Sequence, residues 1–454
     1  MLEFKHVKNK MKRGIFLTKD LTKKDLRQFK TDLDDVPASK ALARAVQQNG
    51  VLKSSADHTF LKNLNRTFSV EVETDSVTNQ KQSGRCWLFA TLNTLRHDFA
   101  KKYKVKDFQF SQNYNSFYDR LEKANKMLET AIELIDRPDD DREYLAMLQW
   151  GDTDGGQWAN GAALINKYGL VPQSVMPETY NSEKTKEISD VLNYKLKNDV
   201  VDLRAHYQAG ATEDELRAEK KKQLAEVYRM LVYAFGQPPV SFDFEYRDDN
   251  KKYHLDRDLT PQEFFQKYVA VDFDQYVVLA DAPDHERNQN FVIPSQNYIF
   301  DGKQVELANV GLKSVKDAAI ASLKDGKTVW FGCDVGHYSD RQLGILATEY
   351  FQKAELFNID LTINKAQRLA TREGECSHAM TLTGVDLVDG QPTKWKVENS
   401  WGDKVGEKGY FIMSDEWFDQ YVYEVVVERK YLTADDLKVV DSPAKALKPW
   451  DSLS

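Results

Sequence analysis

Cysteine is scarce in this 454-residue sequence, which contains only Cys86, Cys333 and Cys376. An odd and sparse count excludes a disulfide framework and favours a reducing compartment, in which a free thiol can serve as a nucleophile. We therefore expect a cytoplasmic protein with an ordinary hydrophobic core. Cys333 ends the apolar run Val-Trp-Phe-Gly-Cys, so we expect it to belong to that core.

Long hydrophobic runs are missing as well. No stretch approaches the roughly 20 apolar residues that a membrane helix needs. The segment from Met1 to Lys8 has no apolar centre of the kind found in secretory signals. Hydrophobic residues make up 41% and charged residues 30% of the chain, which is typical of a globular protein with room for two or three core-bearing lobes. We expect no membrane partner.

Charge is spread unevenly along the chain. The net charge is −8, yet residues 1–30 contain ten Lys and Arg against three acids. A basic arm on an acidic body could bind nucleic acid, or it could pack on an acidic surface of the same protein. No zinc-finger spacing, recognition-helix pattern or aromatic ribonucleoprotein motif supports the first possibility, so nucleic acid is an unexpected partner but stays an alternative.

The order of helical and strand-like patterns predicts an α+β fold. Five segments can be distinguished: an N-terminal arm (1–60), a helical lobe (61–180), a mostly helical insertion (181–325), a β-rich lobe (326–440) and a C-terminal arm (441–454). In the arm, a weak apolar stripe is expected to break at the acidic stretch from Asp32 to Pro37. A helix is expected from Ser314 to Gly326. Strand-like runs follow at 328–333, 379–387, 394–398, 409–413 and 422–427.

Cys86 lies at the start of the clearest helical pattern. Leu88, Leu92, Leu95 and Phe99 follow at intervals of 4, 3 and 4, which predicts an amphipathic helix that begins at or just before Cys86. A helix N-terminus stabilises a thiolate, and the thiolate is the nucleophilic form of cysteine. The simpler alternative is that Cys86 is a small buried hydrophobe on a core helix.

Two donors near Cys86 could stabilise an oxyanion. Its own backbone amide is one, and the side-chain amide of Gln80, six residues upstream, is the other. The segment Gln-Lys-Gln-Ser-Gly-Arg-Cys-Trp, residues 80–87, resembles the nucleophile segment of papain-like cysteine peptidases. Its Ser-Gly-Arg-Cys-Trp portion departs from the papain form C-G-[SA]-C-[WY] and is similar to the bleomycin hydrolase and aminopeptidase C branch.

The base must come from one of eight histidines. His378 opens an apolar strand, where an imidazole can be held rigidly, and Asn399 ends a neighbouring strand, where its amide can fix the tautomer. His97 lies about 16 Å along the helix from Cys86, too far to act as base. His337 follows a strand end and is the runner-up. The remaining histidines lie in polar stretches and are expected to be exposed: His6, His58, His206, His254 and His285.

The resemblance extends to Asn-Ser-Trp-Gly at 399–402, which is similar to the family's asparagine motif. It implies a two-lobed papain-like fold and a shielding role for Trp401. His378 follows Cys86 by 292 residues, whereas papain-type enzymes have roughly 130–150. The inserted residues 181–325 account for the difference, and the branch carries such insertions.

Asp154, Gly155 and Gly156 are candidates for substrate binding. Adjacent glycines let an extended peptide approach the enzyme's backbone, although a tight turn would explain them equally well. By resemblance, the glycine pair lines the substrate cleft, and Ser377 joins the substrate-binding set. Cys376 and His378 lack a second Cys/His pair at zinc spacing, so we expect no metal and no cofactor.

The resembled branch consists of homohexameric aminopeptidases whose C-terminal arm enters the cleft and presents its carboxylate to the substrate's amino group. This implies a thiol aminopeptidase acting on peptides, with Ser454 supplying the carboxylate. Only three residues follow Pro-Trp-Asp in this sequence. That short tail leaves an oligoendopeptidase as the alternative. A catalytically dead scaffold is a third possibility, but the intact set of Gln80, Cys86, His378 and Asn399 argues against it.

Overall fold

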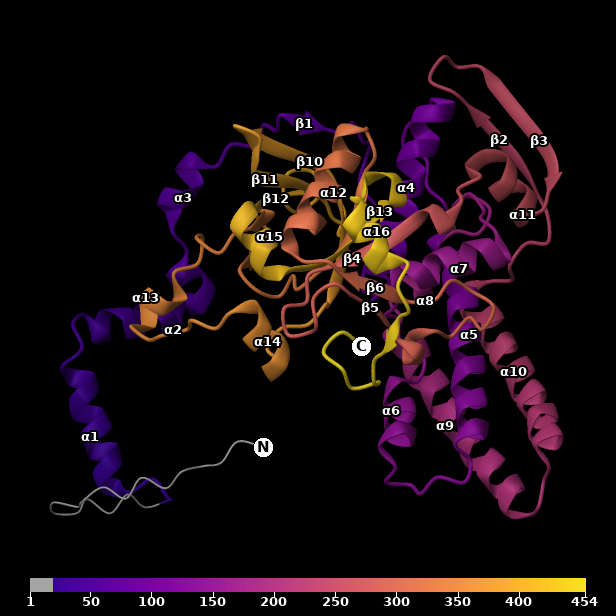
Figure 1. Cartoon of the computed structure of the whole chain (residues 1–454), viewed down its shortest axis with the longest axis horizontal. Helices are drawn as coiled ribbons and strands as arrows, with labels where there is room; N and C mark the ends of the chain where they lie inside the picture. The colour runs from indigo at the N-terminus through magenta and orange to yellow at the C-terminus, as the bar shows by residue number, and fades with distance from the viewer. Residues whose placement is uncertain (1–18) are drawn as a thin grey trace. The chain divides into compact units, whose positions relative to one another are not determined.

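The computed structural model describes residues 19–454. His6 and most of the basic stretch lie outside the described residues, and so do the predictions made for them. The chain divides into two compact units (Figure 1). The smaller unit contains the chain up to Lys62 together with residues 349–361, and the larger unit contains the remainder. Each unit is described by itself below.

The smaller unit is helical. It contains α1 (Lys23–Asp34), α2 (Ser39–Ser55), most of α3 (His58–Asn63) and α13 (Lys353–Phe357), and α13 packs on α2. Thr22 and Asp25 form a capping box that starts α1. The predicted break within the stretch from Asp32 to Pro37 is confirmed, because α1 ends at Asp34 and α2 begins only at Ser39. Pro37 contributes to this end, since a proline disfavours helical geometry in the residue before it.

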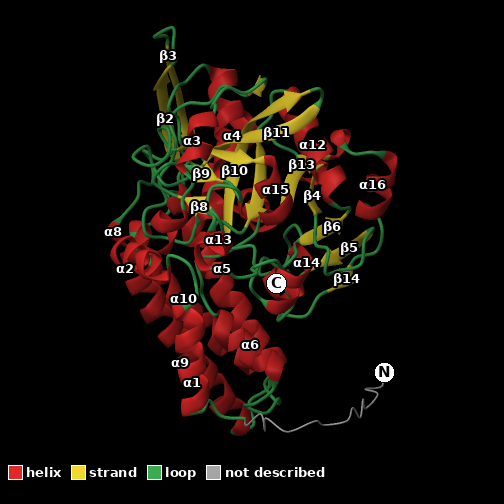
Figure 2. Cartoon of the chain, turned by 90° about the vertical axis from the view of Figure 1, so that its left-hand side faces the viewer, coloured by secondary structure: helices red, strands yellow, loops and turns green. Residues whose placement is uncertain are grey.

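The first half of the larger unit is rich in helices, and α5, α6, α9 and α10 lie together below the strands in Figure 2. Serine or threonine caps start two of the longest, Ser111 for α5 and Thr212 for α10, and the second is the predicted capping box. The predicted stripe from Leu88 to Phe99 is buried on α4. The helices are α4 (Cys86–Tyr103), α5 (Gln112–Glu133), α6 (Arg142–Trp150), α7 (Trp158–Tyr168), α8 (Tyr180–Glu183), α9 (Lys186–Gln208) and α10 (Glu213–Phe235).

The segment after α10 differs from the expected mostly helical insertion. A hairpin, β2 (Phe242–Arg247) and β3 (Tyr253–Leu259), precedes short helical turns that begin with α11 (Pro261–Phe264). The chain then forms β4 (Tyr276–Ala280), β5 (Gln289–Val292) and β6 (Glu306–Asn309), all of which join the main sheet. The apolar run of β4 pairs with β13, so a partner about 150 residues away decides its structure.

The main sheet contains the strands that carry the predicted base and its partner. Its central order is β4-β13-β7-β10-β11-β12, and β1 (Val70–Glu71) pairs with β10. These strands are β7 (Val329–Cys333), β10 (His378–Val388), β11 (Gln391–Glu398), β12 (Tyr410–Ser414) and β13 (Val422–Glu428), close to the predicted runs. The short strands β8 (Ser339–Asp340), β9 (Ile345–Leu346) and β14 (Lys445–Ala446) lie at its edges. The α+β prediction is confirmed.

Further helices cover this sheet: α12 (Leu312–Lys324), α14 (Lys365–Thr371), α15 (Asp415–Tyr421) and α16 (Ala434–Val440). The helix expected from Ser314 begins two residues earlier, at Leu312. Helix α4 packs on β10 and β7, so the start of α4 and the start of β10 face the same region. Within residues 19–454, no helix combines the length and apolar character needed to cross a membrane.

Candidate active site

Cys86 is the first residue of α4, as predicted. Its thiol is buried, and burial alone would raise its pKa. The charge of His378, a hydrogen bond from that imidazole and the backbone amides of Ala379 and Trp87 outweigh burial and lower the pKa below the usual value. The sulfur is therefore disposed to be a thiolate.

The residue before the thiol has a role that the sequence did not reveal. Arg85 is buried and forms a bidentate ion pair with Glu178, with nitrogen–oxygen distances of 3.2 and 2.8 Å. Its guanidinium also donates to the backbone oxygen of Ser182 at 2.6 Å. These contacts fix the turn that leads into α4. A buried arginine needs a partner, but no local pattern indicates which acid supplies it.

His378 opens β10 and pairs in register with Cys333 on β7. Its Nε2 lies 3.0 Å from Asn399 Oδ1. An amide oxygen accepts, so Nε2 carries the proton and the other ring nitrogen faces the thiol. Burial alone would lower the pKa of His378, but the Cys86 thiolate and the bonds to Cys86 and Asn399 raise it. The three predicted residues thus form one hydrogen-bonded series.

Trp401 covers this series. Its ring centroid lies 4.9 Å from that of the His378 imidazole. The Arg341 guanidinium lies over the indole of Trp401, 4.2 Å from the ring centroid. Asn399 is fully buried, and its Oδ1 also accepts from the Ser400 amide at 2.8 Å. The tryptophan and the turn therefore keep water away from the bond between His378 and Asn399.

Two backbone hydrogen bonds bring Gln80 to the asparagine motif. The Gln80 amide donates to Ser400 O at 2.8 Å, and the Gly402 amide donates to Thr78 O at 3.0 Å. Gly402 has φ +78°, and a Cβ there would lie 2.4 Å from Asn79 Nδ2, so only glycine fits this approach. The side-chain amide of Gln80 donates one hydrogen to Ser83 O at 2.7 Å and has a second to offer.

A buried ion network ties α4 to β11, whose last residue, Glu398, precedes Asn399. Glu398 is fully buried, and its carboxylate lies 2.6 Å from Arg96 Nη2 and 2.8 Å from His97 Nε2. Burial would raise the pKa of Glu398, but its interactions with His97 and Arg96 lower it. His97 is thus a partner of Glu398, consistent with the prediction that it is too distant to act as base.

The glycine pair lies against the residue that follows the nucleophile. A Cβ on Gly156 would come within 2.6 Å of the Trp87 ring, whereas a Cβ on Gly155 would meet nothing closer than 3.8 Å. Lys123 donates to the backbone oxygens of Thr153 and Gly155 at 2.8 and 2.5 Å. The pair is therefore held from α5 and packed on the indole.

Asp154 supports this arrangement from inside the protein. Its carboxylate accepts from the Gly84 amide at 2.7 Å and also contacts Arg120 and Thr185. Its backbone oxygen accepts from Trp87 Nε1 at 2.7 Å. The prediction grouped Asp154 with the substrate-binding residues, but its carboxylate is occupied by protein partners and it does not line the cleft described next.

A cleft of about 720 Å³ adjoins the candidate triad. Gly156, which packs on Trp87 next to the nucleophile in the sequence, and Ser377, which precedes His378, both line it. The C-terminal segment lines it as well, with Ser452, Leu453 and Ser454 among its walls. In Figure 1 this yellow segment curls between α6 and α14. The C-terminal residues thus form part of the wall of this cleft.

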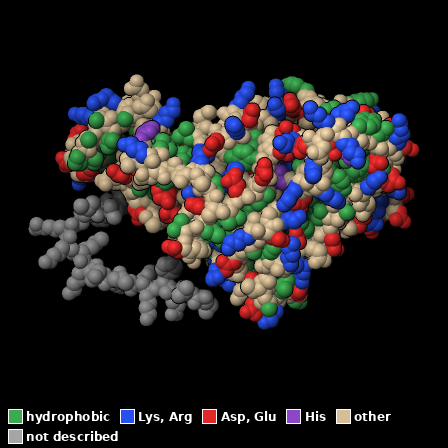
Figure 3. Space-filling view, turned by 90° about the horizontal axis from the view of Figure 1, so that it is seen from above, with side chains coloured by type: hydrophobic (Ala, Val, Ile, Leu, Met, Phe, Trp, Pro, Cys, Tyr) green, Lys and Arg blue, Asp and Glu red, His purple; other side chains and the backbone are tan. Residues whose placement is uncertain are grey.

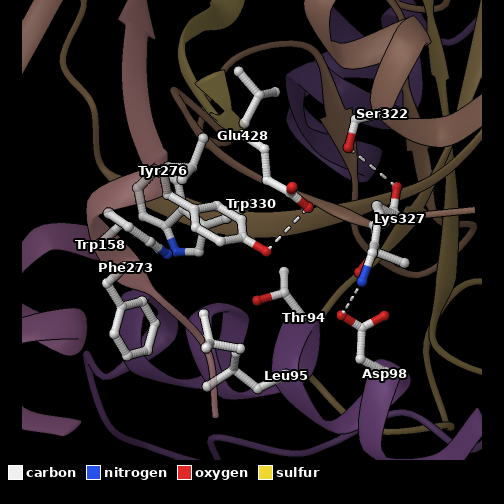
Figure 4. A pocket seen from close by; sticks show the side chains of 14 residues that line it. Thr94, Leu95, Asp98, Trp158, Phe273, Tyr276, Ser322, Lys327, Trp330 and Glu428 are labelled. Carbon is white, nitrogen blue, oxygen red and sulfur yellow. Dashed lines mark hydrogen bonds and ion pairs between the residues drawn. The ribbon is translucent and has the colours of Figure 1, made fainter. Parts of the chain in front are cut away.

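A second cavity, between α4 and the sheet, is far smaller. It encloses about 30 Å³ (Figure 4), which is room for little more than one water molecule. Tyr276 donates to Glu428 at 3.4 Å on one side, and Lys327 pairs with Asp98 at 2.6 Å on the other. This volume is too small for a peptide, so the cavity is an internal packing feature.

The remaining histidines behave differently from one another. His337 stacks on Tyr421 and lies 3.4 Å from Asp334, so the runner-up base has structural partners of its own. His58 and His206 are exposed as predicted. His254 and His285 are only partly exposed, and the prediction for them is wrong because each is paired with a carboxylate, His254 with Asp248 and His285 with Asp451 of the C-terminal segment. Within residues 19–454, no three His, Cys, Asp or Glu side chains form a potential metal site.

Comparison with known proteins gives consistent matches over nearly the whole chain. Residues 20–454 match the Peptidase C1-like family. Aminopeptidase E of Lactobacillus helveticus is 49% identical over 96% of this chain and 99% of its own length. Aminopeptidase G of Lactobacillus delbrueckii subsp. lactis is 48% identical over 96% and 100%. The crystal structure of pepw from Lactobacillus rhamnosis superimposes with a TM-score of 0.94 at 49% identity, covering 96% of this chain and 99% of that one.

Proposed function

This chain belongs to the Peptidase C1-like family and is a cysteine-type peptidase, and we propose that it is an aminopeptidase that releases N-terminal residues from peptides. The observation that carries the proposal is the hydrogen-bonded series from Cys86 through His378 to Asn399, at the head of a helix and beside a cleft. In this proposal Cys86 is the nucleophile, His378 the acid and base, and Asn399 the residue that orients the imidazole.

The reaction follows from the protonation states of these groups. The Cys86 thiolate attacks the carbonyl carbon of the scissile bond, and the imidazolium of His378 gives its proton to the leaving amine. The acyl-enzyme that remains is a thioester. His378, now neutral, takes a proton from water as the water attacks, and the acid product leaves with the thiolate restored. The bond to Asn399 keeps the imidazole in the orientation that both steps need.

Two donors are available for the oxyanion of each tetrahedral intermediate. The Cys86 amide points outward at the helix start, where backbone amides have no helical partner. The second hydrogen of the Gln80 side-chain amide is the other. The hydrogen bonds between residues 78–80 and 400–402 fix Gln80 beside the motif that contains Asn399, which supports this assignment.

Substrate binding is assigned to Gly155, Gly156 and Ser377. Because Lys123 already binds the Gly155 oxygen, Gly156 is the member of the pair best able to exchange backbone hydrogen bonds with a peptide. Ser454 and Leu453 line the same cleft, which leaves room for few substrate residues on that side. A carboxylate at Ser454 would attract the cationic amino group of a peptide.

An oligoendopeptidase is the second candidate. The cleft retains about 720 Å³ beside the C-terminal residues, so substrate residues on the amino side of the cut could also be accommodated. The two candidates differ in one measurable property. An aminopeptidase needs an unblocked amino terminus, whereas an oligoendopeptidase cleaves an N-acetylated peptide at internal bonds.

We further propose that the protein is a homohexamer in the cytoplasm. Large apolar side chains are exposed on α9 and α10, including Tyr194 and Tyr233, each at 80%, which supports an oligomer. Three cysteines without a disulfide support a reducing compartment. Basic and acidic side chains are interspersed on the face seen in Figure 3, which gives nucleic acid no continuous basic track there. Light scattering would measure the assembly directly.

The central experiment compares the three thiols. Iodoacetamide should label Cys86 far faster than Cys333 or Cys376. Burial raises the pKa of Cys333, and desolvation of the sulfur together with the neighbouring Glu424 raises that of Cys376, although the rest of that residue is exposed, whereas the ion pair with His378 lowers the pKa of Cys86. Cys86→Ala should abolish hydrolysis of an aminoacyl substrate, whereas the matched variant Cys376→Ser should retain it. Equal labelling of the three thiols, or full activity of Cys86→Ala, would overturn the proposal.

A further inference from the structure

His285 occupies an unusual position between two carboxylates. It lies in the connection between β4 and β5, and its Nδ1 is 2.9 Å from Asp284 Oδ1. Its Nε2 is 2.9 Å from Asp451 Oδ1, in the C-terminal segment. Carboxylates only accept, so both ring nitrogens must donate and the imidazole must carry a positive charge. The bonds to Asp284 and Asp451 raise the pKa of His285 to about 9.

Asp451 also forms hydrogen bonds with the last two residues of the C-terminal segment. The carboxylate that binds His285 also accepts from the Leu453 amide at 3.1 Å. Ser454 donates from its amide to Asp451 O at 3.3 Å and from its hydroxyl to Lys448 O at 2.8 Å. Residues 448–454 therefore form one closed turn, and the His285–Asp451 pair is its ionic link to the body of the protein.

Asp284 adds a second attachment from the same connection. Its other carboxylate oxygen accepts from the Ser452 hydroxyl at 2.7 Å. One histidine and its neighbouring acid thus hold two residues of the turn. The side chains of His285 and Asp451 are only 14% and 24% exposed, so water screens this pair less than it screens a surface ion pair.

The other charged groups nearby have different partners. Glu286 lies 3.8 Å from Lys445, and Arg287 pairs with Asp281 at 2.7 Å. The edge of Phe291, on β5, faces the imidazole at a centroid distance of 5.4 Å. Arg372, at the end of α14, donates to Trp450 O and contributes to the lowered pKa of Asp451. His285 is the cation that the Asp451 carboxylate contacts directly.

We propose that His285 is a positioning residue that determines where the enzyme cuts, because it fixes the C-terminal turn in the cleft through Asp451. This inference rests on the proposed function. With the pair intact, Leu453 and Ser454 form a fixed wall, and the substrate's amino end must stop there. With the pair broken, the turn can leave the wall, and a peptide that continues past this point can occupy the vacated part of the cleft.

The test uses one oligopeptide in two forms, with an unblocked and with an acetylated amino terminus. Products are identified by mass spectrometry, and kcat/KM is measured for both forms with the full-length protein. His285→Gln and Asp451→Asn should each raise the ratio of blocked to unblocked kcat/KM by about tenfold, since each removes a charge-assisted hydrogen bond. The double variant should show no more than either single change, because both variants break the same link.

His254→Gln is the matched control. His254 also contacts a carboxylate, Asp248, at 3.1 Å, and it stacks on Tyr246 in the β2–β3 hairpin. The blocked-to-unblocked ratio should stay at the wild-type value in this variant. Equal increases in His254→Gln and His285→Gln would overturn the inference, because a general loss of order would then explain both.

Labelling of Cys86 separates this inference from the proposed function. Iodoacetamide should react with Cys86 at the wild-type rate in both single variants, since neither residue contacts the triad. An unchanged ratio together with normal labelling would overturn the role of His285 and leave the peptidase assignment intact. If His285→Gln does not fold, Asp451→Asn alone decides the outcome, because Asp451 lies in the terminal turn and its removal leaves the core unaltered.

The pH dependence gives an independent reading. In the wild type, the ratio of kcat/KM for the blocked peptide to that for the unblocked peptide should rise as the pH increases through about 9. At that pH His285 becomes neutral, and its ion pair with Asp451 is lost. The amino group of the unblocked peptide also titrates in this region, with a pKa of about 8. The same titration of the substrate occurs with His285→Gln, so the difference between the two profiles isolates the histidine. Coincident profiles would contradict the inference.

Discussion

The residues around Cys86 and the residues from 446 to 454 both reach the cleft, but they are held by different kinds of contact. The first group is fixed by buried hydrogen bonds and ion pairs, among them Arg85 with Glu178 and Glu398 with Arg96. The second is fixed by partly exposed groups, with His285 at their centre. The comparison indicates that the chemistry is set by the interior, whereas the position of the cut is set by contacts nearer the surface that can change without loss of chemistry.

The largest expected effect comes from the buried side. His378→Ala should lower kcat/KM by about 10⁴-fold, because the thiolate loses both its counter-ion and its proton donor. The measurement is steady-state hydrolysis of an aminoacyl substrate. Deletion of residues 450–454 should change which peptides are cleaved, but the deletion variant should still cleave an N-acetylated peptide at a rate comparable to that of the wild type on an unblocked peptide. A tail deletion as damaging as His378→Ala would remove the distinction between the two regions.

Breaking the buried ion network should destabilise the protein. Glu398→Gln leaves Arg96 buried without its counter-ion, and we expect a loss of about 3 kcal/mol in the free energy of unfolding. Denaturant titration measures it. Glu71→Gln is the matched control, because Glu71 forms a more exposed pair with Lys396 and should contribute little. Similar losses in the two variants would show that burial does not decide the strength of these pairs.

The two adjacent glycines allow steric and substrate effects to be separated. Gly156→Ala places a methyl group against Trp87, and overpacking of this kind costs about 1–3 kcal/mol. We expect lower stability and about a 10- to 100-fold lower kcat/KM. Gly155→Ala has room for its methyl group and should keep wild-type stability. Equal stability of the two variants would contradict the packing described for Gly156.

A smaller effect is expected in the pH dependence of Cys86 alkylation, which should extend to lower pH than for an ordinary thiol. The pKa of Cys86 is lowered and that of His378 is raised, and both shifts favour the thiolate–imidazolium pair. Alkylation should therefore persist at pH 7, where an ordinary thiol is only about 3% ionised, and should be about tenfold faster than that of such a thiol. In His378→Ala only burial remains as a major influence, so the rate at pH 7 should fall and recover only at high pH. An unchanged pH profile in this variant would exclude His378 as the cause.

The smallest effect is expected at the outer contact of the tail. Lys448 lies 3.4 Å from Glu143, and both side chains are largely exposed. Lys448→Gln should change neither stability nor the blocked-to-unblocked ratio measurably, because exposed ion pairs contribute little. Comparison with His285→Gln under the same conditions checks it. A large change in the ratio would mean that the tail is held by its surface charges as a group.

The sequence predicted the triad because each member lies in a local pattern that can be read without its partners. A helix start, a strand start and a strand end are each visible within a few residues of Cys86, His378 and Asn399. The α+β class was predictable for the same reason. The short strands β4 to β6 were harder to predict from the sequence, because the residues that pair with β4 lie about 150 positions away.

The residues that support the site were not predictable, and the reason is physical. Whether Asp154 contacts a substrate or a buried arginine depends on the place of Arg120, which comes from another helix. His285 lies in a polar stretch and was expected to be exposed, yet Asp451 covers it from the far end of the chain. A single sequence gives the chemical capacity of these side chains, but their partners are decided by the tertiary structure.

The distance along the chain between the thiol and its activating imidazole has a consequence during synthesis. A ribosome that has exposed the first lobe has produced a polypeptide with Cys86 but without His378, which is translated 292 codons later. In that interval the sulfur has no counter-ion and should have the reactivity of an ordinary thiol. A translation product that stops before His378 would therefore be inert toward the other nascent chains of the cell, and proteolytic capacity would arise only after His378 and Asn399 have been translated.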